Sequence, residues 1–277
     1  MTTEPKKLKS AEIRERMGEL VQRNYLHFEL KGLTKGTRDI ISDAVNGIMD
    51  RVGANPLNTF HLFSGLMEAL LNAVKGNIRY TIFKKEIKAR LFDVEPSSQD
   101  VEQLLEIILN TSPLRDAIQR YIVPDKIKRD VLNILTWEEK IRVRKLELKT
   151  EERVLLQSIR DEIKKDERKI SLKIRVDKDM ISIRLRNDSP IMDIDMERIR
   201  ESREKHYHLY LEGKSSDFFR PEFLDEKESA GFGIAMIDEG YYNMKLNPME
   251  YFTYIQGQHA TTVYMNYPIE ALCSMDF

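Results

Sequence analysis

The sequence predicts an α/β (α+β) two-layer sandwich, with helices on one face of a mostly antiparallel sheet and a large helical insertion. Segments with helical periodicity and segments with strand alternation are interleaved along the chain, and consecutive short strands favour antiparallel pairing. A highly charged stretch with helical periodicity separates the two halves. We therefore expect four parts: an N-terminal helix (1–24), a first part of the domain (25–83), the insertion (84–169) and a second part (170–277).

The composition excludes several classes of protein. The chain has 277 residues, 41% of them hydrophobic, which is enough to build a core. Lys and Arg number 45 against 46 Asp and Glu, so no basic excess indicates nucleic acid as a partner. A single cysteine, Cys273, rules out an internal disulfide. No apolar run reaches the length of a membrane span, and we expect a cytoplasmic protein with no membrane association.

The first half begins with apolar residues at helical spacing over 9–23. Alternation over 25–31 predicts a strand. Thr34 is a suitable N-cap for a helix over 35–52, which ends at Gly53. A strongly apolar helix follows the Asn55-Pro56 turn and extends from about 57 to 79.

The insertion is richer in charge than the rest of the chain. Residues 99–110 form an amphipathic pattern, and 125–169 are almost unbroken in Lys, Arg, Glu and aliphatic residues. This pattern predicts a long helix or a helical hairpin. Because a helix buries its apolar stripe somewhere, we expect the insertion to mediate dimerisation or docking of a protein partner. A merely solvated helical elaboration is the alternative.

The apolar period changes from 3.6 to 2 at Ile170, which marks the start of a hairpin. Its strands cover 170–176 and 180–186, around an Asp-Lys-Asp turn. The remaining elements are a helix (192–212), a polar loop (213–230), a helix opened by two glycines (231–240) and two closing strands (251–256 and 260–267).

One polar face interrupts the apolar helix over 62–79. Glu68, Asn72, Lys75 and Arg79 recur at the spacing of a single helix face. An exposed stripe of an amphipathic helix is the simpler explanation. A ligand face is the alternative, because an amide oxygen can bind Mg²⁺ and a lysine one turn further can contact a phosphate.

Four motifs in order give the second explanation more weight. Residues 68–75 resemble the N-box of the gyrase, histidine-kinase and MutL (GHKL) ATPase superfamily. Residues 187–191 (NDSPI) resemble its first glycine box, 229–235 (SAGFGIA) its second, and 260–268 the closing Gly-Thr-Thr-Phe strand that ends in Pro. The layout is most similar to anti-sigma-factor kinases and to histidine-kinase ATPase domains.

The resemblance implies ATP and Mg²⁺ as cofactors and a role for each matched residue. Asn72 would bind the Mg²⁺, Glu68 would act as general base, and Lys75 would contact a phosphate. The segment Gly231-Phe232-Gly233 would bring backbone amides to the phosphates at a helix N-terminus. Thr262 would lie near the adenine.

The first box departs from the family pattern. The aspartate that accepts a hydrogen bond from adenine is Asn187, and the two glycines are Ser189 and Ile191. Ile191 would line the adenine pocket or crowd it. These changes predict weak nucleotide binding and little turnover.

Three further candidates are weaker. His27 precedes Phe-Glu-Leu-Lys, which faintly resembles a phospho-acceptor histidine box, but it lies on an expected strand. His206 and His208 lack a third ligand for a metal site. The basic residues of 140–149 alternate with glutamates, which favours a solvated face over nucleic-acid binding.

Three functions are consistent with these observations. The leading one is an ATP-binding signalling regulator that transfers the γ-phosphate to a partner protein. The second is a non-catalytic interaction module with a degenerate nucleotide pocket. The third, an ATP-driven clamp like the chaperones or MutL, requires further domains that a chain of 277 residues does not accommodate.

Overall fold

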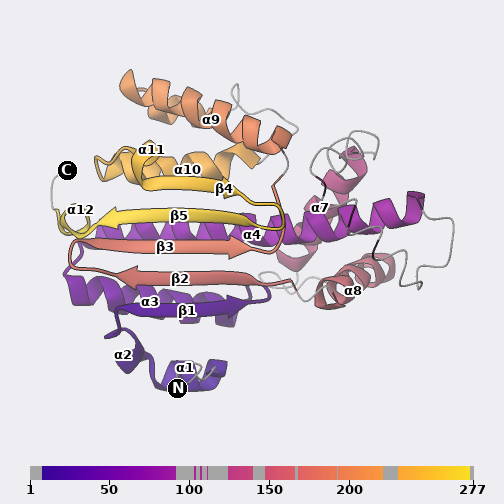
Figure 1. Cartoon of the computed structure of the whole chain (residues 1–277), viewed down its shortest axis with the longest axis horizontal. Coiled ribbons are helices and arrows are strands. Elements are labelled where there is room, and N and C mark those ends of the chain that lie inside the picture. Colours follow the sequence, from indigo (N-terminus) through magenta and orange to yellow (C-terminus); the bar gives the residue numbers. More distant parts are fainter. Residues whose placement is uncertain are drawn as a thin grey trace.

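The structure is a computed structural model, and it describes residues 8–91, 124–139, 147–165, 168–191, 193–220 and 230–274, together with residues 103, 107 and 111. It confirms the α+β two-layer sandwich (Figure 1). Five antiparallel strands form one sheet in the order β1-β2-β3-β5-β4. The strands are β1 (Tyr25–Leu30), β2 (Ile170–Val176), β3 (Met180–Asn187), β4 (Phe252–Gln256) and β5 (Thr261–Pro268).

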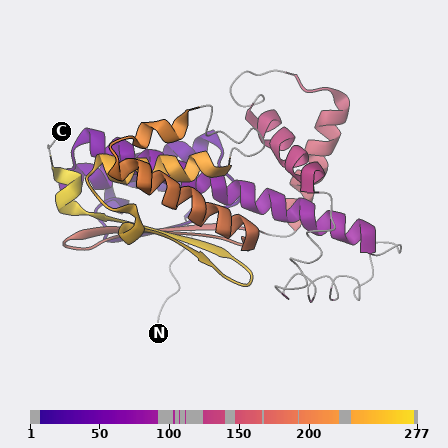
Figure 2. The same cartoon turned by 90° about the horizontal axis from the view of Figure 1, so that it is seen from above.

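Three helices cover one face of this sheet: α3 (Lys35–Val52), α4 (Pro56–Leu91) and α10 (Ala230–Asn243) (Figure 2). Helix α9 (Asp193–Leu211) packs against α10. The short helices are α1 (Ser10–Glu15), α2 (Met17–Leu20), α11 (Pro248–Tyr251) and α12 (Ile269–Cys273). None of the described helices is both long enough and apolar enough to span a membrane.

Local capping explains where the first long helices begin and end. The Thr34 side chain accepts a hydrogen bond from the Thr37 amide at 3.2 Å and so caps α3, as the sequence predicts. Gly53 ends α3 in the left-handed conformation, at φ 72°. Asn55 accepts from the Leu57 amide at 2.8 Å and turns the chain into α4 at Pro56.

The main core lies between the sheet and its helices. Alternate residues of the strands point inward, so that Leu172, Ile183 and Met265 are almost fully buried against Leu66 and Leu70 of α4. This alternation is the one that the sequence predicts for 170–186.

Helix α4 continues well beyond the expected end at about residue 79. Its 36 residues span about 54 Å, and the expected boundary at 83/84 falls inside it. The extension packs against α7 (Pro124–Glu139) and α8 (Thr150–Lys165). A second hydrophobic cluster fills this helical arm, with Ile87, Trp137 and Leu156 among its buried members.

The arm therefore buries much of its apolar stripe within the chain. Of the long helix or helical hairpin expected over 125–169, the described residues show two shorter helices that contact each other and α4. The amphipathic pattern at 99–110 lies almost entirely outside the described residues. Leu132 and Val154 remain 58% and 66% exposed on the arm. Association through the arm stays a prediction.

A buried ion pair joins α9 to α10. Arg203 donates to both carboxylate oxygens of Asp238 at 3.0 Å, and its guanidinium also contacts the Pro248 carbonyl and the Phe252 ring. The Asp238 side chain is fully buried. Burial raises the pKa of Asp238, and the Arg203 charge and hydrogen bonds lower it in part.

Replacing Arg203 with Met should destabilise the protein by about 3–5 kcal/mol at pH 7, because the Asp238 carboxylate would be left buried and unpaired. A buried carboxyl with a raised folded-state pKa loses stability as the pH rises through that pKa, so the deficit should shrink on acidification. Urea unfolding at pH 7 and at about pH 5 measures both effects. Arg198→Met on the same helix, where the arginine is 46% exposed, is the control and should cost under about 0.5 kcal/mol. A penalty that does not vary with pH would contradict this account.

Candidate functional site

The polar face of α4 brings Glu68 and Asn72 beneath β4. Both side chains are half-buried and lie one helical turn apart. Tyr254 of β4 reaches them. Burial is the main reason why the pKa of Tyr254 is raised. The Asp238 and Glu68 carboxylates raise this pKa further, whereas the Arg203 charge and the Asn72 amide lower it. The Tyr254 hydroxyl therefore lies near the Asn72 side chain, and the Glu68 carboxylate acts on it through its charge.

Two polar atoms at this point lack a hydrogen bond to any described residue. They are the Asn72 amide nitrogen Nδ2 and the Tyr254 hydroxyl, and both are buried. An unpaired buried donor costs free energy, so such atoms mark a place where a water or a ligand is favourable. The amide oxygen is the atom of the Asn72 side chain that could hold a cation.

Glu68 also contacts the first turn of α10. A Cβ atom added to Gly233 would lie 1.9 Å from Glu68 Oε1 and 2.8 Å from its Cγ. Only a residue without a side chain allows this approach. The carboxylate consequently sits at the end of α10 where the helix dipole is positive, which stabilises a negative charge.

Gly233→Ala should therefore destabilise the wild type by about 1–3 kcal/mol, because the new methyl group overlaps the whole Glu68 side chain. In a Glu68→Ala background the same change should be neutral or stabilising, since alanine has the higher helix propensity. A double-mutant cycle by urea unfolding measures the coupling. Gly18→Ala, at a helical glycine with open space around it, is the control. Equal costs of Gly233→Ala in both backgrounds would exclude this contact.

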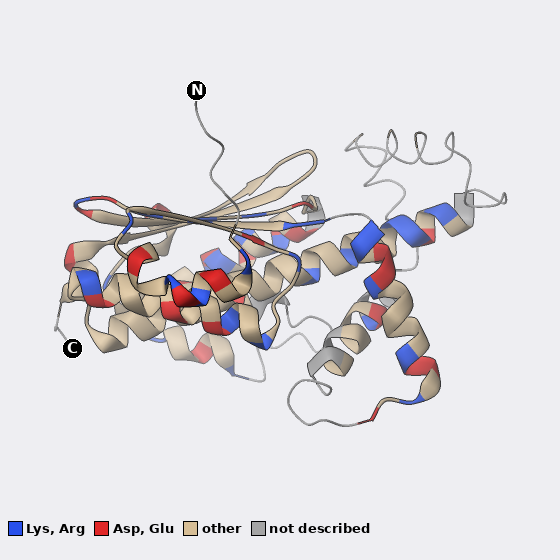
Figure 3. Ribbon diagram, turned by 90° about the horizontal axis from the view of Figure 1, so that it is seen from below, with Lys and Arg blue, Asp and Glu red and all other residues tan. Residues whose placement is uncertain are grey.

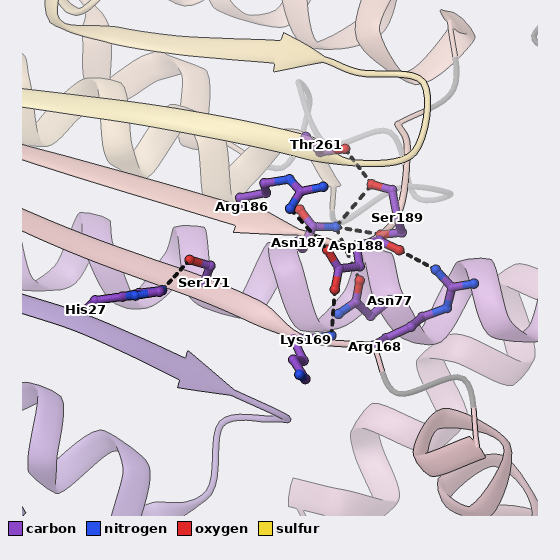
Figure 4. Close-up of polar contacts among 10 residues, drawn as sticks. All are labelled: His27, Asn77, Arg168, Lys169, Ser171, Arg186, Asn187, Asp188, Ser189 and Thr261. Atoms are coloured by element: carbon purple, nitrogen blue, oxygen red, sulfur yellow. Dashed lines mark hydrogen bonds and ion pairs between the residues drawn. The ribbon is translucent and has the colours of Figure 1, made fainter. Parts of the chain in front are cut away.

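A buried polar network joins the end of β3 to α4 (Figure 4). Asn187 Nδ2 donates to the Ser189 carbonyl at 3.3 Å, to the Ser189 hydroxyl and to Asn77 Oδ1 at 3.4 Å. Thr261 of β5 donates to the same Ser189 carbonyl at 2.8 Å. The carbonyl can only accept, so it fixes the orientation of the Asn187 amide. The amide oxygen of Asn187 forms no hydrogen bond with a described residue and remains an acceptor for a ligand.

This network depends on close contact with α4. A Cβ added to Gly76 would lie 3.2 Å from both Asn187 Nδ2 and Ser189 Oγ. Ser189, which stands where the family has its first glycine, is 1% exposed and its hydroxyl is bonded within the chain. The Ser189 side chain thus fills space at the surface of α4.

Asn187→Asp should cost about 1–3 kcal/mol at pH 7, because a carboxylate would face the Ser189 carbonyl in place of a donor. Burial and this acceptor should raise the pKa of the introduced carboxyl above its unfolded value of about 3.9. The lost stability should therefore return as the pH falls, which thermal unfolding between about pH 4.5 and pH 7 would reveal. Asn46→Asp on α3 is the exposed control. A stabilising effect at pH 7 would overturn the assigned orientation.

The other predicted site residues are placed as follows. Lys75 is half-buried on α4 and pairs with none of the described residues. Arg79 forms an ion pair with Asp195 of α9 at 2.7 Å, so it serves the fold. The Ile191 carbonyl accepts from Gln256 at 3.1 Å. Gly231 and Phe232 belong to the first turn of α10.

The expected role of Thr262 requires a correction. The β3–β5 register pairs Asn187 with Thr261 and Arg186 with Thr262. Because alternate strand residues point to opposite faces, Thr261 faces the helices and Thr262 lies on the other face of the sheet. Thr261 therefore takes the place that the sequence gives to Thr262.

The two histidines considered for a metal do not converge. His206 is fully buried, bonds Glu239 at 3.2 Å and packs against Phe218 and Tyr242, whereas His208 is exposed. Within the described part of the chain, no cluster of three metal-binding side chains occurs. Phe218 is anchored in a short 3-10 helix, Ser215–Phe219, so the start of the expected loop is ordered. Phe223 lies outside the described residues.

Sequence reasoning missed Tyr254 and Asn77. Tyr254 follows no family motif, and only its inward position on β4 brings it to Asn72. Asn77 lies on α4 beyond the N-box, at one further turn from Ala73. The sequence signal for Asn77 is an amide residue within a largely apolar helical stretch, and the structure shows that this side chain is buried.

A comparison of this chain with protein-family models, with curated proteins and with solved structures found no match.

Proposed function

We propose that this protein is an ATP-binding, cytoplasmic signalling regulator of the GHKL type, which acts on a partner protein. The observation that supports this proposal is that the other three motif segments gather, directly or through one another, at residues 68–77 of α4, which include the first motif. Gly233 contacts Glu68, the Asn187–Ser189 segment packs on Gly76, and Thr261 bonds Ser189. Segments separated by up to about two hundred residues thus converge where the resemblance requires a nucleotide.

The donor set fits the implied ligand. The free oxygen of Asn187 could accept from the adenine amino group, as a neutral acceptor weaker than a carboxylate. The Asn72 oxygen could hold Mg²⁺, which takes hard oxygen ligands together with phosphate oxygens and water. Lys75, which none of the described carboxylates neutralises, is one turn away for a phosphate.

Glu68 would position and deprotonate the attacking group. A carboxylate within hydrogen-bond reach of a water or hydroxyl acts as general base, and Asn72 beside it would hold the metal that neutralises the phosphates. The acceptor would be a hydroxyl or imidazole of the partner. Transfer forms a bond from this oxygen or nitrogen to the γ-phosphorus and releases ADP.

The non-catalytic module stays the second candidate, because Ser189 fills the position of a glycine and Glu68 already contacts Gly233. In that case nucleotide would act as a structural ligand without turnover. Formation of ADP from ATP in the presence of the partner distinguishes the two candidates.

Calorimetric titration with ATP tests the proposal. We expect a dissociation constant of about 10⁻⁵–10⁻³ M that weakens when Mg²⁺ is removed. Asn72→Ala should weaken the binding free energy for ATP by about 1–3 kcal/mol, because it removes a polar contact to a charged group. Asn46→Ala, which removes an exposed amide on α3, is the matched control and should bind like the wild type. Glu68→Gln should bind ATP and abolish any phosphate release. No binding at millimolar ATP would exclude the nucleotide site.

A further inference from the structure

The face of the sheet opposite α3, α4 and α10 (Figure 2) carries several of the Lys and Arg residues whose positions on the ribbon are blue in Figure 3. Lys173 and Arg175 of β2 and Arg184 and Arg186 of β3 are among them, and we call this set the basic stripe. In the β2–β3 register, Lys173 lies directly opposite Arg184, while Ser171 and Ser182 face the two outer members. The stripe therefore crosses two central strands diagonally over about 14 Å.

The two central members of the stripe repel each other. Like charges directly opposite across antiparallel strands destabilise a sheet. Arg175 has a carboxylate nearby, Asp177 at 2.9 Å, and Arg186 has Asp188 at 3.7 Å. Lys173 and Arg184 have no ion pair with a described residue. The folded chain thus retains an unfavourable pair that an external anion would relieve.

The side chains next to the basic stripe favour an acidic peptide over a single-stranded nucleic acid as its ligand. Tyr264 lies opposite Arg184 on β5, and the Arg184 guanidinium lies over its ring, 5.8 Å from the centroid. The half-buried ring is therefore partly covered, which disfavours base stacking, the main contribution of aromatic residues to single-stranded nucleic-acid binding. Arginine forks bind carboxylates and phosphates alike, so it is the partly covered Tyr264 ring that favours an acidic peptide over a single-stranded nucleic acid.

We propose that the basic stripe is a docking surface for an acidic segment of a partner protein. Apart from Ile255, which is 48% exposed, and Tyr25 at the β1 edge, this face offers little large apolar surface. The interaction is consequently electrostatic, fast to form and weakened by salt. It does not depend on nucleotide binding, because the stripe lies on the other face of the sheet from Asn72.

Fluorescence anisotropy with a labelled peptide of alternating Glu and Ser, about ten residues long, tests the proposal. The wild type should bind it, and raising NaCl from about 50 to about 300 mM should weaken binding. The pair Lys173→Glu and Arg184→Glu should lose at least about tenfold in affinity. The pair Lys164→Glu and Lys165→Glu on α8 changes the net charge equally and should bind like the wild type.

A second measurement separates a docking role from a structural one. Lys173→Thr should weaken peptide binding yet raise the melting temperature by about 1–2 °C, since it removes the like-charge contact and adds a good strand former. Two results would overturn the proposal: equal loss of affinity in the Lys164/Lys165 control, or tighter binding of a thymidine oligonucleotide of similar length through the same two residues. The second would make the stripe a nucleic-acid surface.

Discussion

The contacts that build the candidate site depend on how closely α4 approaches its neighbours. A Cβ at Gly65 would lie 3.3 Å from Met265 of the sheet, and one at Gly76 would lie 3.2 Å from the Asn187–Ser189 network. On the other side, Gly233 of α10 leaves room for Glu68. These absent side chains let one helix contact the sheet, the β3 end and α10 at once. The polar groups of the site are brought together by that contact.

The same helix connects two hydrophobic clusters. Its first two thirds complete the main core, and its last turns provide Ile82, Phe83 and Ile87 to the arm. The arm and the candidate site therefore share one continuous helix.

The sequence predicts the elements well where local chemistry is sufficient. Thr34, Gly53 and Pro56 fix helix ends within their own neighbourhoods, and alternation from Ile170 fixes which strand residues face the core. The sequence predicts the end of α4 about twelve residues too early. The last turns of this helix are charged, and packing against Trp137 and Leu156 of the arm stabilises them.

The same distinction between local sequence and tertiary contacts applies to the residues of the candidate site. Motif spacing selects Glu68, Asn72 and Asn187 as candidates, and their roles stay predictions. The choice between Thr261 and Thr262 depends on strand register, which a one-residue shift inverts. Tyr254 and the Gly233–Glu68 contact come from separate elements that only the fold brings together. The Arg79–Asp195 pair similarly shows that one member of the polar face of α4 serves packing between helices.

Gly233 illustrates how one residue can satisfy two requirements. The resemblance assigns the glycine to phosphate binding, and the structure gives it a contact with Glu68. Both place a negative group at the N-terminal turn of α10, where unpaired amides and the helix dipole favour an anion. Under the proposed function, the nucleotide phosphates and the Glu68 carboxylate would compete for the same positive N-terminal end of α10. Nucleotide binding would then move Glu68 away from Gly233, and the residue expected to act as general base would be released only when its substrate is present.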